Sequence, residues 1–116
     1  MLPDRVLVVD DDLSMRQMLS ILLERSGYTV ETAASAEEAL VKLDEHWPDL
    51  VMTDLNMPGM HGIDLLTEVK RLGAVSERDV EVIVVTAYGS TRTAVDAMTK
   101  GAANYVLKPF NNDELK

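Results

Sequence analysis

The sequence alternates short apolar runs with longer segments of helical period, and this alternation restricts the possible folds more than any other feature. The apolar runs are rich in β-branched residues and have the length of strands; they cover residues 5–9, 28–33, 50–53, 80–86 and 105–107. The segments at 14–26, 35–45, 63–72 and 90–100 repeat apolar residues at spacings of three and four, as amphipathic helices do. Strand–helix alternation with short connections predicts one doubly wound parallel sheet with helices on both faces.

Capping residues agree with these helix boundaries. Gly27 and Gly101 follow two of the helical segments and are typical stop signals. Ser35, with Glu38 three residues later, forms a capping-box pattern, and Ser90 is placed to cap the segment that follows it. The expected helices are therefore supported by their ends as well as by their apolar period.

The last residues interrupt the pattern. Residues 112–114 look like the first turn of a further helix, with acids where the helix dipole favours them. A complete helix would need about eight or more additional residues. We therefore expect the last helix to be truncated, and residues 1–116 to be the N-terminal part of a longer protein.

Composition excludes several classes of function. The 116 residues suit one domain with one core, and no apolar run approaches the roughly 18 residues that a transmembrane helix needs. The chain has no cysteine, which excludes disulfides and thiolate metal sites. A net charge of −9 argues against direct binding of this domain to nucleic acid. These properties predict a cytoplasmic protein without membrane contact.

Polar residues follow the predicted strands at the ends where a parallel sheet gathers functional groups. Asp10 and Asp11 follow the first strand, Asp54 the third, Thr86 ends the fourth and Lys108 follows the fifth. Because these ends meet at one edge of the sheet, the five side chains are expected to lie close together.

The acidic residues suggest a metal site. Asp10, Asp11 and Asp12 are adjacent, and their mutual repulsion is costly unless a cation or a helix N-terminus offsets it. Helix capping accounts well for Asp12 and poorly for the other two. Together with Asp54, the latter pair forms a set of hard oxygen ligands suited to Mg²⁺.

A metal beside a carboxylate, with a lysine and a hydroxyl nearby, suggests phosphoryl transfer. Asp54 can act as a nucleophile that forms an acyl phosphate. The ammonium of Lys108 and the hydroxyl of Thr86 could bind oxygens of the transferred group. Taken singly, Lys108 is better explained as a surface lysine and Thr86 as a strand residue with a local hydrogen bond, and only their convergence on one edge favours the functional role.

Several segments together resemble the signature segments of response-regulator receiver domains of bacterial two-component systems. They are Val8 to Asp11, Thr53 to Gly59, Val85 to Ala87 and Tyr105 to Phe110, in the same order and at the same spacing as in that family. The resemblance covers essentially the whole chain. It implies a flavodoxin-like (βα)5 fold with strand order 2-1-3-4-5.

The resemblance also implies the roles of individual residues. Asp54 would be the phosphoacceptor, and it would ligate Mg²⁺ together with Asp11 and the backbone carbonyl of Asn56, while Asp10 would act mainly through water. Lys108 and Thr86 would bind the phosphoryl group. The Lys108–Pro109 peptide bond is expected to be cis, a form largely confined to X–Pro bonds.

The implied function is that of a phosphorylation-dependent signalling switch. A sensor histidine kinase would supply the phosphoryl group, and Thr86 and Tyr105 would then shift a surface formed by the fourth helix and fifth strand. Such a domain assists its own phosphorylation and dephosphorylation without being a turnover enzyme. The resemblance also allows a homodimer.

A narrower resemblance concerns the output. The segment from Thr86 to Ser90 and the later segments 94–98 and 101–102 resemble receivers attached to enhancer-binding transcription activators with an AAA+ ATPase domain. This implies an attached or downstream output that regulates transcription.

Two residues depart from, or add to, the family pattern. His61 stands where the family most often has aspartate, and we expect a solvent-facing loop residue whose charge varies near neutral pH. Tyr88, two residues after Thr86, is placed to cover the phosphate. We therefore expect Tyr88→Ala to change the lifetime of the acyl phosphate, and an unchanged dephosphorylation rate would refute this.

Two rival functions stay open at this point. Asp10 and Asp12 after a buried strand resemble the nucleophile and general acid of haloacid-dehalogenase-type phosphatases, but that family needs a further acidic pair and leaves Asp54 without a role. A pure interaction module of the same fold would usually lack one of the site residues. An EF-hand beginning at Asp54 is rejected, because its fifth position is Pro58 and its twelfth is Leu65.

Overall fold

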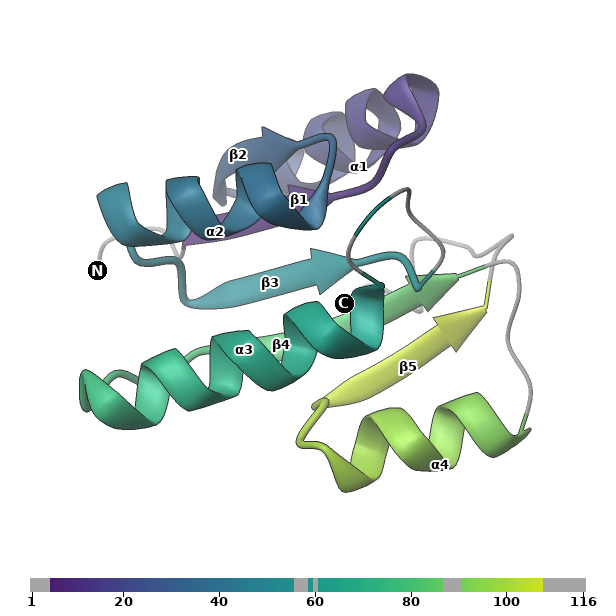
Figure 1. Cartoon of the computed structure of the whole chain (residues 1–116). Helices are drawn as coiled ribbons and strands as arrows, with labels where there is room; N and C mark the ends of the chain where they lie inside the picture. Colours follow the sequence, from purple (N-terminus) through teal and green to yellow (C-terminus); the bar gives the residue numbers. More distant parts are fainter. Residues whose placement is uncertain (1–4, 56–58, 60, 87–90, 108–116) are drawn as a thin grey trace.

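A computed structural model describes residues 5–55, 59, 61–86 and 91–107, and it contains five strands and four helices in strict alternation (Figure 1). In chain order these are β1 (Arg5–Val9), α1 (Leu13–Arg25), β2 (Thr29–Ala33), α2 (Ala36–Glu45), β3 (Leu50–Thr53), α3 (Gly62–Val75), β4 (Glu81–Thr86), α4 (Thr91–Thr99) and β5 (Asn104–Leu107). Each of these elements overlaps a segment that the sequence predicts. The (βα) alternation is therefore confirmed for the described part of the chain.

The five strands form one parallel sheet in the order β2-β1-β3-β4-β5. This is the predicted flavodoxin-like order. The chain pairs β2 on one side of β1 and then crosses to pair β3 on the other side. The connections after β1 and β3 therefore diverge at the boundary between these two strands, which is where open α/β sheets leave room for a ligand.

Apolar residues cover both faces of the sheet. The larger cluster packs α2, α3 and α4 against alternate residues of the central strands, including Leu7, Val51 and Val82, all at most 3% exposed. The smaller cluster packs Leu19 and Leu23 of α1 against the opposite face. In Figure 1, α2 and α3 lie in front of the sheet and α1 behind it. Burial of both faces explains why the central strands are almost continuously apolar.

Capping side chains fix the start of α2. The hydroxyl of Ser35 accepts a hydrogen bond from the backbone N–H of Glu38 at 3.1 Å, as the capping box predicts. The carboxylate of Glu38 accepts from the N–H of Ala34 at 2.9 Å, one residue before the expected partner. That hydrogen bond, with Lys42 nearby, lowers the pKa of Glu38 although the side chain is largely exposed.

One expected helix end needs correction, and three other expectations fall on residues that the structure does not describe. The sequence predicts that the third helix ends near Leu72, but α3 continues to Val75, and the N–H of Ser76 still donates to the carbonyl of Leu72 at 3.0 Å. Met18 shares the apolar spacing of α1 and is nevertheless 40% exposed. The Ser90 cap, the Lys108–Pro109 peptide and the helical turn at 112–114 lie outside the described residues.

A further observation concerns membranes. Among the residues that the structure describes, no helix is long and apolar enough to span a bilayer.

Candidate functional site

Parallel pairing brings Asp10 and Asp54 to the same edge of the sheet. Val9 of β1 is in register with Thr53 of β3, so the next residue of each strand leaves the sheet at the same level. The ladder continues one step further, because the N–H of Asp54 donates to the carbonyl of Val9 at 3.1 Å. On the other side the N–H of Asp10 donates to the carbonyl of Ala33, also at 3.1 Å. Both aspartates are thus held by backbone hydrogen bonds to a neighbouring strand.

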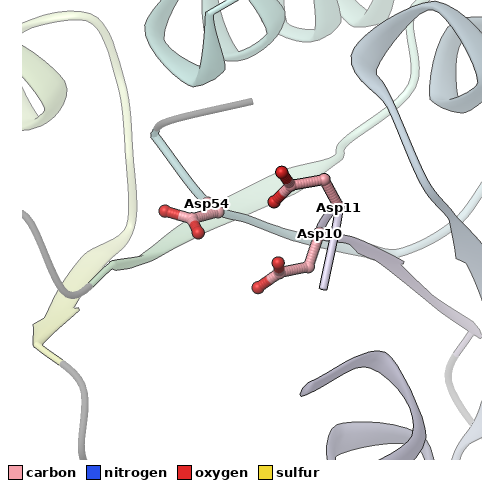
Figure 2. A group of neighbouring side chains, drawn as sticks. All are labelled: Asp10, Asp11 and Asp54. Atoms are coloured by element: carbon pink, nitrogen blue, oxygen red, sulfur yellow. The ribbon is translucent and has the colours of Figure 1, made fainter. Parts of the chain in front are cut away.

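The carboxylates of Asp10, Asp11 and Asp54 form a tight cluster at this edge (Figure 2). One oxygen from each lies within 4.8 Å of the others. Asp10 is 2% exposed and Asp54 5%, whereas Asp11 is exposed. Negative charges so close together, two of them removed from water, repel one another strongly. A divalent cation among them would remove that cost.

Asp12 follows directly on this cluster, and the structure confirms the helix cap that the sequence suggests for it. Asp12 is the N-cap of α1, and its carboxylate accepts a hydrogen bond from the N–H of Met15 at 3.2 Å. Asp10 accepts from the N–H of Asp12 at 2.9 Å, and Arg16 donates to the Asp10 carbonyl at 2.7 Å. This arrangement fixes the turn between β1 and α1, and it weakens the phosphatase reading, in which Asp12 is a general acid.

The connection from β3 to α3 is closed by backbone contacts next to Asp54. The N–H of Gly62 donates to the carbonyl of Leu55 at 2.9 Å. His61 is exposed, as expected, and its Nδ1 accepts from the N–H of Ile63 at 3.3 Å, which makes it the N-cap of α3. Sequence reasoning missed this cap, because histidine is an uncommon capping residue.

Of the other residues that the sequence predicts for the site, the structure describes Thr86 and Tyr105. Thr86 is fully buried at the carboxyl end of β4, two residues beyond Val84, which pairs with Thr53. It therefore reaches the same edge as the acidic cluster. Tyr105 of β5 is partly buried against the larger core cluster. Three further predicted residues, Asn56, Tyr88 and Lys108, lie outside the described part of the chain.

Sequence reasoning also missed a partner of Tyr105. The Tyr105 hydroxyl lies 2.7 Å from the hydroxyl of Thr93 in a partly buried hydrogen bond. This bond joins β5 to α4, the two elements that the resemblance names as the responsive surface. No sequence pattern identifies it, because the two residues are 12 positions apart and belong to different elements.

The arrangement supplies the components for chemistry on an anionic group. Hard carboxylate oxygens can hold a divalent cation. One of the three, the buried carboxylate of Asp54, can also act as a nucleophile, and the hydroxyl of Thr86 lies at the end of the adjacent β4. Carboxylate oxygens for a cation, a carboxylate nucleophile and a hydroxyl at one edge suit chemistry on a phosphoryl group.

Comparison with characterised proteins gives consistent relatives. The chain is 36% identical over 112 residues to the two-component response regulator PhoP of Pseudomonas aeruginosa, covering 97% of this chain and 48% of PhoP. It is 41% identical over 111 residues to the transcriptional regulatory protein ZraR of Escherichia coli, covering 96% of this chain and 24% of ZraR. The chain thus spans half or less of the length of these relatives.

Solved structures share the fold along the whole chain. The CheY of Borrelia burgdorferi, in a complex with CheX, BeF3 and Mg²⁺, superposes with a TM-score of 0.90 at 30% identity, covering 98% of this chain and 84% of that chain. A response regulator from Burkholderia pseudomallei, which carries a phosphorylated aspartic acid, a calcium ion and citrate, has a TM-score of 0.87 at 32% identity, covering 97% and 64% of the two chains.

The family model described as the response regulator receiver domain matches residues 6–116, nearly the full chain. The match agrees with the strand order, with the acidic cluster at the switch between β1 and β3, and with the relatives above. The resemblance seen in the sequence is confirmed, and the chain belongs to the family of response regulator receiver domains.

Proposed function

We propose that Asp54 accepts a phosphoryl group from a sensor histidine kinase, with Mg²⁺ held by the acidic cluster. The observation that carries this proposal is the convergence of Asp10, Asp11 and Asp54, from two neighbouring strand ends, to within 4.8 Å of one another. Repelling carboxylates kept buried at a ligand-binding edge are costly for a domain that binds no cation there.

The donor set fits Mg²⁺. It consists of hard oxygens, and Mg²⁺ is usually held by one or two carboxylates plus waters and phosphate oxygens. Asp11 and Asp54 would ligate it directly with the backbone carbonyl of Asn56, and Asp10 would act through water. When bound, the ion neutralises charge on the transferred group. The Mg²⁺ named for the Borrelia CheY complex supports this assignment.

The chain's own residues would carry out the transfer. A carboxylate oxygen of Asp54 attacks the phosphorus in line, and an acyl phosphate forms on Asp54. The bond from phosphorus to the donor's imidazole nitrogen breaks at the same time, and the imidazole is the leaving group. The Thr86 hydroxyl would donate to one phosphoryl oxygen and the Lys108 ammonium would pair with another. Tyr88 would shield the product and set its lifetime. The phosphorylated aspartic acid of the Burkholderia regulator supports this chemistry.

The output would follow from a shift of Thr86 and Tyr105. Movement of Thr86 toward the phosphoryl group leaves space for the Tyr105 ring, and the Thr93–Tyr105 hydrogen bond would pass that change to α4. An attached or downstream domain would read it and regulate transcription. The name of PhoP as a two-component response regulator and that of ZraR as a transcriptional regulatory protein support a regulatory output.

Other features of the proposal follow from this role. The domain would act in the cytoplasm as a phosphoacceptor and not as a turnover enzyme. Its net charge of −9 supports the view that nucleic acid is contacted by a separate domain. Residues 1–116 would form the N-terminal receiver of a longer regulator, and a homodimer is compatible with this arrangement.

The test is intact mass after incubation with a small phosphodonor such as acetyl phosphate. The wild-type chain is expected to gain one phosphoryl group with Mg²⁺ and none after chelation. Asp54→Asn should gain none, whereas Asp44→Asn, the same charge change at an exposed position on α2, should react like the wild type. A gain that persists in Asp54→Asn would sink the proposal.

A further inference from the structure

Gly62, the first residue of α3, lies directly against the backbone of Asp54. A Cβ atom at Gly62 would stand 2.1 Å from the Asp54 carbonyl oxygen, 2.9 Å from its carbonyl carbon and 2.8 Å from the Cα of Leu55. These are backbone atoms, which cannot rotate away as a side chain can. Any larger residue at this position must displace either the start of α3 or the peptide that carries Asp54.

The carbonyl that Gly62 touches is fixed from a second side. Thr53 is 1% exposed, and its hydroxyl donates to the Asp54 carbonyl at 3.0 Å. The next carbonyl, that of Leu55, accepts from the N–H of Gly62 at 2.9 Å. The Asp54–Leu55 peptide is thus held between a buried hydroxyl and the first turn of α3, while the Asp54 N–H is held by Val9.

The position of this peptide decides where the Asp54 carboxylate lies. Asp54 must present one oxygen to a cation shared with two other carboxylates and another to a phosphorus atom. Errors of about 1 Å in such positions cost on the order of a hundredfold in rate. An added Cβ at Gly62 would stand 2.1 Å from the Asp54 carbonyl oxygen, which is more than 1 Å closer than an ordinary contact of 3.4–4 Å. The displacement that it forces is therefore large enough to affect the reaction as well as the packing.

We propose that Gly62 is a positioning residue for the phosphoacceptor. Because Gly62 has no side chain, the Asp54–Leu55 peptide can lie against the start of α3, where the Thr53 hydroxyl also holds it. This position of the peptide brings the Asp54 carboxylate close to the carboxylates of Asp10 and Asp11. This inference rests on the proposed function of Asp54. Gly62 takes no part in the chemistry itself.

The test compares Gly62→Ala with Gly73→Ala in the full 116-residue chain. Gly73 is a matched control, since it is a buried glycine of the same helix whose added Cβ would stand 2.9 Å from a backbone carbonyl, that of Arg78. Both variants should lose thermal stability. Only Gly62→Ala should lower the Mg²⁺ affinity and the phosphorylation rate at saturating Mg²⁺, by about ten- to a hundredfold.

A third readout does not depend on phosphorylation. The backbone amide NMR signals of Asp54 and Leu55 should move in Gly62→Ala and stay in place in Gly73→Ala. If the wild type gains no phosphoryl group, the proposed function fails, yet these signals and the Mg²⁺ affinity still test Gly62. Unmoved signals, wild-type affinity, or equal losses in both variants would overturn the inference.

Thr53→Val provides a second variant if Gly62→Ala does not fold. It keeps the side-chain volume and removes only the hydroxyl that holds the Asp54 carbonyl. The expected result is a folded protein with Asp54 and Leu55 amide signals shifted and a phosphorylation rate lowered about three- to tenfold, as the loss of one hydrogen bond predicts. A wild-type rate with unmoved signals would contradict the proposed role of this peptide.

Discussion

Acidic side chains lie both at the carboxyl ends of β1 and β3 and, as the single residue Glu31, in the middle of β2, and the two places differ in what surrounds the carboxylates. At the carboxyl ends, Asp10, Asp11 and Asp54 place like charges within 4.8 Å, and two of the three are buried. In β2, a carboxylate oxygen of Glu31 lies 4.0 Å from the Arg5 guanidinium and 3.6 Å from the His46 imidazole, and each of the three side chains is at least 37% exposed.

The difference shows what each group is for. Exposed pairs of opposite charge contribute little to stability, typically up to about 1 kcal/mol, and they need no ligand. A buried cluster of like charge lowers the stability of the domain unless something binds it. We therefore assign function to the buried cluster, where the fold tolerates repulsion between carboxylates. The ion pairs of Glu31 serve as a reference for how a carboxylate behaves in this domain without a ligand.

The largest expected effect is stabilisation of the domain by Mg²⁺. At a concentration about 100 times its dissociation constant, a ligand that binds only the folded state stabilises it by about 2.7 kcal/mol. Thermal unfolding with and without Mg²⁺ should show this increase in the wild type. Asp10→Asn should lose most of it, whereas Glu31→Gln should keep it. A similar Mg²⁺ effect on Asp10→Asn and the wild type would break the contrast between the two groups.

A second expectation separates Asp12 from its acidic neighbours. Asp12→Ala removes the N-cap of α1 and should cost about 1 kcal/mol of unfolding free energy, as such caps do. Its Mg²⁺ affinity should stay within about threefold of the wild type, because the carboxylate serves the helix. Denaturant unfolding and Mg²⁺ titration measure the two quantities. Asp12→Ser, which can still cap, should restore the stability, and a loss of Mg²⁺ binding in Asp12→Ala would place Asp12 in the cation site.

A third expectation concerns communication from the acidic site to α4. Thr93→Val keeps the side-chain shape and removes the hydroxyl bonded to Tyr105, so it should cost about 0.5–1.5 kcal/mol of unfolding free energy. It should also reduce the change in the Tyr105 amide NMR signal on phosphorylation. Thr93→Ser should preserve both. An unchanged Tyr105 response in Thr93→Val would show that the signal reaches α4 by another route.

The smallest effect is expected at the reference group. Glu31→Gln should alter the free energy of unfolding by less than about 0.5 kcal/mol, since the side chain is exposed and the ion pairs are screened by solvent. Denaturant unfolding at low and high salt would measure it. A loss comparable to that of Asp12→Ala would mean that exposed charge pairs contribute more to this fold than their geometry indicates.

Sequence reasoning predicted the features that depend on chain-local patterns. The five strands follow from β-branched runs, and the meeting of Asp10 with Asp54 follows from parallel pairing once the strand order is known. The helix end at Val75 was missed: the apolar period fades after Leu72, yet α3 continues with Gly73 buried inside it.

Features that depend on contacts between distant residues could not be read from the sequence. The Thr93–Tyr105 bond and the approach of Gly62 to the Asp54 backbone both depend on how helices settle against strand ends. Neither leaves a periodic or compositional signal. Met18 illustrates the same limit, because it keeps the apolar spacing of α1 and yet is 40% exposed.

The most direct measurement is to locate the phosphoryl group on the chain. After reaction with acetyl phosphate and Mg²⁺, borohydride reduction converts a phosphorylated aspartate to homoserine, which peptide mass spectrometry can place. The account predicts conversion at Asp54, with Asp10, Asp11 and Asp12 unchanged. Conversion at Asp10 would contradict it and favour the phosphatase reading instead.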